Sequence, residues 1–183
     1  SWAPNENFIS LRTNSKWCRS LGRRIGWIEA PEFIIEAMED IQSCTILSPD
    51  KLHQMAFGKF ITTSIEDGSL DVYLEKIRKL YKNTAEKTAE IIQKYLDFPI
   101  IQPEGGLYIF MKVNTDGTKF VETVLTKTGV LFIPGQGFGK TGKNAVRVSF
   151  GPLVEEIDKI EQGIIKTAKY LNETKPFLKI NQK

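Results

Sequence analysis

The sequence predicts a mixed α/β fold in which helices and a little strand come first, a long helix follows, and a compact α+β unit ends the chain. Apolar residues recur at helical spacing from Leu70 to Leu96. Short apolar runs bounded by turn residues come mostly after this helix. The composition, with 41% hydrophobic and 26% charged residues, is that of an ordinary globular protein. We therefore expect three regions: 1–70, a connecting helix over 71–96, and 97–183.

The first region is predicted to hold two strands and two helices. Phe8 to Leu11 and Arg24 to Glu29 have the pattern of short strands. Pro31 is typical of the first turn of a helix, and Asp50 marks the start of the next one. The buried face of that second helix is predicted to comprise Leu52, Met55, Ala56 and Phe60.

The later elements follow the same local rules. The inner stripe of the long helix is predicted to be Leu74, Ile77, Tyr81, Thr84, Thr88, Ile91 and Tyr95. Strands are expected at 100–101, 107–113, 130–133 and 145–150, with a helix over 118–126. Pro152 is expected to open the last helix, with Val154, Ile157, Ile160, Ile164, Ala168 and Leu171 inward.

Charge and composition exclude several classes of function. The 25 basic and 22 acidic residues are interspersed, so no nucleic-acid stripe stands out. No apolar run reaches membrane length and no signal peptide is visible, so we expect a cytoplasmic protein with no membrane partner. Cys18 and Cys44 form no disulfide or metal pattern. His53 is the single histidine, which rules out histidine pairs, and it is expected on a helix face rather than in a site.

Lys16 has the most informative surroundings in the chain. Thr13 and Ser15 place hydroxyls three residues and one residue before it. Further on come Gly22, Arg24, Gly26 and Trp27. A lysine amine can form a Schiff base with an aldehyde cofactor. The arginine and the hydroxyls are suited to hold a phosphate group by charge-assisted hydrogen bonds.

A second candidate is Arg147, which stands alone in the apolar run Val146–Phe150. A cation in such a strand is costly unless an anion meets it. From the local sequence, the anion is either a carboxylate of the protein or one of a ligand. An edge position that faces water is the remaining alternative.

The stretch Gly135–Thr141 reads GQGFGKT and imitates a nucleotide-binding loop. That motif needs a glycine five residues before Gly139, where this chain has Pro134. It also needs a following helix, whereas the strand at Ala145 comes next. The sequence therefore does not predict an NTPase.

Several blocks together resemble the class I and II aminotransferases, pyridoxal-phosphate enzymes of fold type I. They are the Lys16 frame, then PEGG-x-Y-x-F at 103–110, GV-x-x-x-PG-x-x-FG at 129–139 and VR-x-S-F at 146–150. The agreement runs from about Asn7 to Leu171. It implies the C-terminal half of such an enzyme, made of the end of the large cofactor-binding domain and the whole small domain.

The resemblance also implies roles. Lys16 would be the catalytic residue that holds pyridoxal 5'-phosphate, with Thr13, Ser15 and Arg24 on its phosphate. Arg147 would bind the substrate carboxylate, with an amino acid and a 2-oxo acid as small-molecule partners and a homodimer as the assembly. The open alternatives are a lyase or decarboxylase of the same fold, or an inactive small-domain module. The family's other cofactor-binding groups precede the lysine, so the 183-residue chain alone is expected to be inactive.

Overall fold

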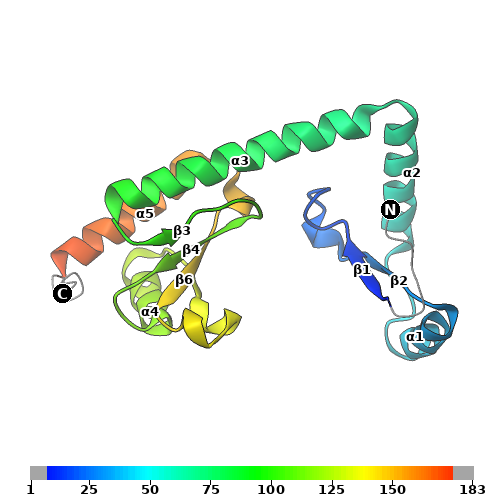
Figure 1. The fold of residues 1–183 in the computed structure, drawn as a ribbon, viewed down its shortest axis with the longest axis horizontal. Helices are drawn as coiled ribbons and strands as arrows, with labels where there is room; N and C mark the ends of the chain where they lie inside the picture. The colour runs from blue at the N-terminus through cyan, green and yellow to red at the C-terminus, as the bar shows by residue number, and fades with distance from the viewer. Residues whose placement is uncertain (1–7, 175–183) are drawn as a thin grey trace. The chain divides into compact units, whose positions relative to one another are not determined.

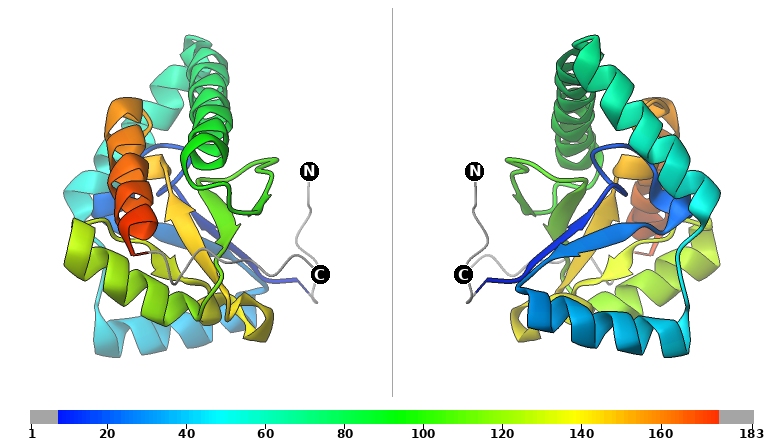
Figure 2. Two further views of the ribbon diagram at one scale, coloured as in Figure 1. Left: turned by 90° about the vertical axis from the view of Figure 1, so that its left-hand side faces the viewer. Right: turned by 90° about the vertical axis from the view of Figure 1, so that its right-hand side faces the viewer.

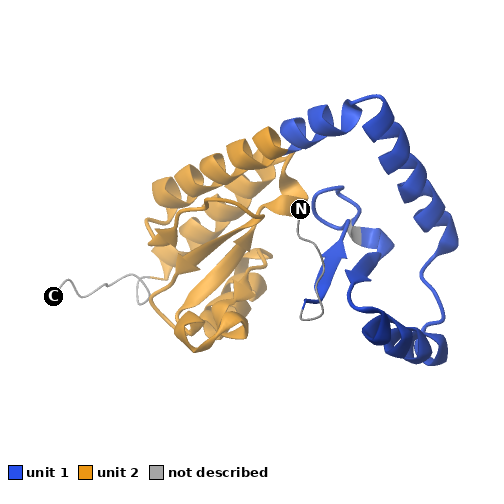
Figure 3. Ribbon diagram, turned by 45° about the vertical axis from the view of Figure 1, so that its right-hand side comes forward, with its two compact units in different colours: residues 1–77 blue, residues 78–183 orange. Residues whose placement is uncertain are grey.

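The computed structural model describes residues 8–174, which divide into two compact units (Figure 1). The first unit comprises residues 1–77 and the second residues 78–183, as the colours of Figure 3 show. The division lies within the long helix α3 (Ser69–Tyr95). Each unit has its own internal packing.

The first unit begins with an antiparallel hairpin. Strand β1 (Ser10–Thr13) pairs with β2 (Gly26–Glu29), and Thr13 lies opposite Gly26. A Cβ atom at Gly26 would lie 2.8 Å from the carbonyl oxygen of Arg12, so only glycine allows the two strands to approach this closely. The predicted strands therefore exist, and they pair at the end that leads into Lys16.

Two helices follow the hairpin. Helix α1 (Glu32–Thr45) starts directly after Pro31, and α2 (Lys51–Glu66) is capped by Asp50. The Asp50 carboxylate accepts hydrogen bonds from the backbone N–H groups of Leu52 and His53. The first N–H groups of a helix have no acceptor within the helix, and Asp50 provides one for two of them. Both helix starts agree with the prediction from the sequence.

The predicted buried face of α2 was wrong by about one position. Leu52 and Met55 are 76% and 64% exposed, and Phe60 is 38% exposed. The residues turned inward are His53, Phe57, Ile61 and Ser64. Helical spacing shows which residues share a face, but the hairpin decides which face is covered, and here it contacts the face that carries the polar histidine.

The second unit contains a four-stranded antiparallel sheet in the order β3-β4-β6-β5. Its strands are β3 (Ile100–Ile101), β4 (Tyr108–Lys112), β5 (Ile133–Pro134) and β6 (Ala145–Ser149). Strand β5 is shorter than the predicted 130–133, because Phe132 packs in the core next to Phe120 without joining the ladder. Strand β6 lies inside the sheet, between β4 and β5.

One face of this sheet packs against helices. Helix α4 (Gly117–Thr128), helix α5 (Ile157–Glu173) and the C-terminal part of α3 contribute to one core cluster with the strands (Figures 1 and 2). From the sheet, the cluster takes Ile109, Met111, Val146 and Val148. Because side chains alternate along a strand, Tyr108, Phe110 and Arg147 lie on the opposite face. This face is the one that matters for the candidate site.

The long helix and the last helix mostly follow the predicted pattern. Thr84 and Thr88 of α3 are fully buried, and the Thr84 hydroxyl is 3.0 Å from the carbonyl oxygens of both Leu80 and Val154. The last helix begins at Ile157 rather than at Pro152, since a short 3₁₀ helix, η4 (Gly151–Leu153), comes first. The predicted inward residues from Ile160 to Leu171 are buried.

Candidate active site

Lys16 lies in a tight turn that leaves the end of β1. The Cys18 N–H donates to the carbonyl oxygen of Asn14 at 3.2 Å, and the Arg19 N–H donates to that of Lys16 at 3.2 Å. Asn14 is fully buried and Ser15 nearly so, whereas Lys16 is exposed. The turn is therefore anchored before the lysine and presents the lysine itself at the surface of its unit.

The two hydroxyl groups before Lys16 are hydrogen-bonded to each other. The Thr13 hydroxyl donates to the carbonyl oxygen of Ile25 at 2.7 Å and lies 2.9 Å from the Ser15 hydroxyl. The Ser15 N–H also donates to the Thr13 oxygen, at 3.2 Å. A hydroxyl has one proton to give, and the Thr13 proton is used by Ile25. Ser15 is therefore the donor in the hydrogen bond between the two hydroxyls, and an added anion can take this proton only in place of Thr13.

Arg24 lies at the same end of the hairpin, in the segment that leads into β2. It directly precedes Ile25 and follows the 3₁₀ helix η1 (Leu21–Arg23). Its backbone is left-handed, with φ 55° and ψ 46°, and Arg19 also has a positive φ of 52°. Non-glycine residues in this conformation cost on the order of 1–3 kcal/mol and cluster at functional sites. Arg19 and Arg24, which follow Lys16 in the chain, both have this strained backbone conformation.

Cys18, two residues after Lys16, is the cysteine of this turn. Burial raises the pKa of the Cys18 thiol above its usual value. The group therefore stays protonated at neutral pH, and a protonated thiol is a poor nucleophile.

Arg147 occupies the centre of β6 in the second unit. It lies opposite Phe110 of β4 and Ile133 of β5, so it is in an inner strand and the edge alternative is wrong. Its guanidinium carbon is 4.2 Å from the ring centroid of Tyr108 and 4.8 Å from that of Phe138. The guanidinium therefore lies over the faces of two aromatic rings.

Among the described residues, no acidic group pairs with the polar atoms of Arg147. Its Nε atom is buried and has no hydrogen-bond partner, and within residues 8–174 its guanidinium makes no ion pair. Contacts with aromatic faces stabilise the cation by about 0.5–2 kcal/mol, but they leave its N–H groups free to donate. Of the three alternatives, a carboxylate from outside this part of the chain is the one that this geometry favours.

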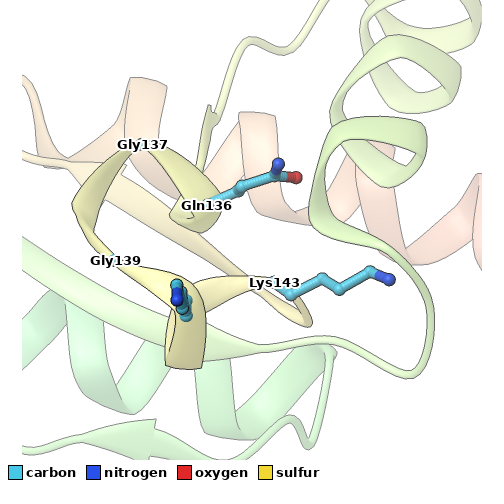
Figure 4. A pocket seen from close by; sticks show the side chains of 5 residues that line it. Gln136, Gly137, Gly139 and Lys143 are labelled. Atoms are coloured by element: carbon cyan, nitrogen blue, oxygen red, sulfur yellow. The ribbon is translucent and has the colours of Figure 1, made fainter.

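Phe138 comes from the loop that imitates a nucleotide-binding motif. This loop forms two short 3₁₀ helices, η2 (Gly135–Phe138) and η3 (Lys140–Gly142), and then enters β6. A hollow of about 570 Å³ on it is lined by Gln136, Gly137, Gly139, Lys140 and Lys143 (Figure 4). No α-helix follows the loop directly, so the helix end that would hold a nucleotide's phosphates is missing. The loop instead contributes the Phe138 ring that contacts the Arg147 guanidinium.

Sequence reasoning missed three residues of these sites. Tyr108 and Phe138 were part of the quoted motifs, but nothing local showed that their rings meet Arg147. His53 was expected on a helix face away from any site. It does lie on α2, yet its Nε2 atom is within hydrogen-bond distance of residues on both sides of Lys16. The contacts of Tyr108 and His53 join residues more than 30 positions apart, and that of Phe138 depends on how its loop folds, so none leaves a signal in a local pattern.

The described residues hold neither a membrane-spanning helix nor a cluster of metal ligands. Within residues 8–174, no helix combines the length and the apolar character that crossing a bilayer requires. In the same residues, no three histidine, cysteine or carboxylate side chains gather as metal ligands.

Comparisons with known proteins identify the same family that the sequence motifs resemble. The family model described as aminotransferase class I and II matches residues 2–164. An aspartate aminotransferase of Pyrococcus abyssi is 30% identical over 176 residues, which cover 93% of this chain and 42% of that protein. An aromatic-amino-acid aminotransferase of Thermococcus litoralis is 28% identical with the same coverage.

The fold has a counterpart in solved structures. The aromatic aminotransferase of Pyrococcus horikoshii matches with a TM-score of 0.79 and 28% identity, over 93% of this chain and 44% of that one. The chain thus spans less than half the length of the relatives it matches. Because the family model covers most of the sequence, the chain belongs to the class I and II aminotransferases, a pyridoxal-phosphate-dependent family.

Proposed function

We propose that the protein containing this sequence is an aminotransferase that uses pyridoxal 5'-phosphate to move an amino group from an amino acid to a 2-oxo acid. The proposal rests on the hairpin end, where Ser15 and Lys16 follow β1 and Arg24 precedes β2 in a chain of this family. An amine for an aldehyde and cationic or hydroxyl donors for a phosphate are the set that this cofactor requires.

Each group at the hairpin end has its own task in this proposal. The Lys16 amine holds the cofactor covalently and, once released, moves a proton to and from the substrate as general base and acid. Arg24 binds the phosphate as a fork-shaped cation. Ser15 donates its hydroxyl proton to the phosphate, while Thr13 keeps Ser15 in place, since its own proton is given to Ile25. When bound, the cofactor supplies the electron sink for the reaction.

Arg147 binds the carboxylate of the amino acid in this proposal. Contacts with two aromatic rings restrict the movement of its guanidinium, and a restricted guanidinium favours a bidentate bond to a carboxylate. Because the described residues supply no acidic partner, the charge of this guanidinium is available to such a carboxylate.

The proposal also assigns the regions of the chain. We infer that 1–70 belongs to the large cofactor-binding domain, 71–96 is a connecting helix and 97–183 belongs to the small domain. The coverage of 42% of the relatives supports this inference. So do apolar side chains of α1 and α2, such as Ile41 and Leu52, which residues 8–174 leave exposed. A cytoplasmic homodimer is the assembly we propose, on the resemblance alone.

A half-reaction separates this function from a lyase or decarboxylase of the same fold. With an amino acid and no 2-oxo acid, we expect the bound cofactor to change from its aldehyde to its amine form, with one equivalent of 2-oxo acid released. Absorbance spectroscopy and product analysis measure both. A product that forms while the cofactor stays in the aldehyde form would overturn the proposal, because lyases and decarboxylases return the cofactor unchanged.

The variant Arg24→Gly should separate cofactor binding from stability. Glycine adopts a positive φ without strain, so we expect the free energy of unfolding to stay within about 1 kcal/mol of the original value. Losing a charged hydrogen-bond donor should weaken cofactor binding at least about tenfold. Urea denaturation and cofactor titration measure the two effects, with Arg23→Ala as the matched control. Unchanged cofactor affinity in Arg24→Gly would remove Arg24 from the phosphate site.

A further inference from the structure

His53 reaches the Lys16 turn from helix α2. Its Nε2 atom is 3.4 Å from the Asn14 amide nitrogen and 3.2 Å from the Ser20 hydroxyl. Asn14 stands two residues before the lysine and Ser20 four residues after it. One nitrogen atom of a helix side chain therefore contacts both ends of the turn.

The contact is reinforced by aromatic packing one helical turn away. Phe57 stacks on the His53 ring, with 6.4 Å between centroids and 22° between planes. The same Phe57 ring meets Trp17, next to Lys16, edge-on at 5.8 Å. Positions four apart on a helix share one face, so α2 offers one polar and one aromatic contact to the same turn. The His53 ring is thereby held in orientation by a neighbour that also packs on the turn.

Asn14 shows why the polar contact matters. It is fully buried, and its Oδ1 atom has no hydrogen-bond partner. A buried polar group without a partner costs about 1–3 kcal/mol. The contact with His53 is therefore important for stabilising the Asn14 side chain. If the amide turns over, a proton on Nε2 satisfies Oδ1 instead, and His53 stays the partner either way. Removing the imidazole nitrogen leaves both ends of the Asn14 amide without this partner, instead of one.

We propose that His53 is a positioning residue for Lys16, acting through hydrogen bonds to Asn14 and Ser20 that fix the turn between them. Its effect on the turn follows from these contacts alone, and its effect on cofactor attachment rests on the function proposed for Lys16. Displacing a reacting group by about 1 Å can cost on the order of a hundredfold in rate, so a loosened turn slows any reaction of the lysine amine.

Two substitutions separate the polar contact from packing. His53→Phe keeps an aromatic ring against Phe57 and removes the nitrogen, whereas His53→Gln keeps a polar group near the position of Nε2 and removes the ring. In the protein without added cofactor, hydrogen exchange at the amides of Cys18 and Arg19 reports opening of the turn, because both donate within it. We expect exchange at least about tenfold faster in His53→Phe, and within about threefold of the original in His53→Gln.

Controls keep this test interpretable if His53→Phe folds poorly. Ser20→Ala removes one of the two contacts without touching α2, and we expect a smaller acceleration in the same direction. Lys59→Gln, on an exposed position of α2, should leave exchange unchanged. Unaltered exchange in both His53→Phe and Ser20→Ala would overturn the proposal, as would equal acceleration in His53→Phe and His53→Gln, which would indicate packing alone.

The second measurement is the rate at which borohydride traps pyridoxal phosphate on the Lys16 peptide. We expect this rate to fall in His53→Phe and to recover in His53→Gln. If no cofactor is trapped at Lys16 in the unsubstituted protein, the function proposed for Lys16 fails, and the exchange measurements still decide the role of His53. If trapping is normal in His53→Phe while exchange is faster, the turn is positioned for something other than cofactor attachment, and the proposal is wrong.

Discussion

Lys16→Ala is expected to abolish covalent attachment of the cofactor and to lower amino transfer by on the order of 10² to 10⁴-fold through the lost proton transfer alone. The turn presents this lysine at the surface of its unit, beside two linked hydroxyls and the strained Arg24. Borohydride reduction followed by peptide mass spectrometry locates the cofactor in the intact protein. Amino transfer is then measured with saturating cofactor, so that lost binding is not mistaken for lost chemistry.

The matched control for this experiment is Lys51→Ala. Lys51 is an exposed lysine at the start of α2, in the same unit as Lys16. We expect normal labelling and normal activity in that variant. Labelling of another lysine in Lys16→Ala at the original stoichiometry would show that the turn is not the attachment site.

Arg147→Ala is expected to raise the amino-acid concentration needed for half-saturation at least about thirtyfold, with cofactor binding nearly unchanged. Truncating one partner of a buried charged pair costs on the order of 2–5 kcal/mol, and each 1.4 kcal/mol corresponds to a factor of ten. The absence of an internal carboxylate partner within residues 8–174 means that the loss should appear in substrate binding. Steady-state kinetics with separate cofactor titration measures the two quantities.

Arg147→Lys and Lys112→Ala complete this test. Lysine offers a point charge rather than a planar fork and cannot lie over the Tyr108 and Phe138 rings in the same way, so it should rescue only partly. Lys112 is an exposed cation on the same face of the sheet, and its removal should leave saturation unchanged. If Arg147→Ala unfolds the second unit while the folded fraction keeps its affinity for the amino acid, Arg147 is structural.

Local sequence patterns predicted the helices well, because helix boundaries depend on neighbouring residues. The long helix was expected from Leu70 to Leu96 and runs from Ser69 to Tyr95, between the turn at Gly68 and Pro99. The cap of α2 at Asp50 was equally visible. Strand β5 was less predictable, since a strand exists only where a neighbour pairs with it, and the partner β6 reaches only Ile133 and Pro134.

The sequence by itself determined the family, the candidate lysine and the candidate arginine, since each stands in a spaced motif that survives without three-dimensional information. The tertiary structure decided how these residues are held. It placed Arg147 in an inner strand with its guanidinium over two aromatic rings, committed the Thr13 proton to Ile25 and brought His53 to the Lys16 turn. These are contacts between residues far apart in the chain, and they form because packing, rather than local propensity, selects which faces meet.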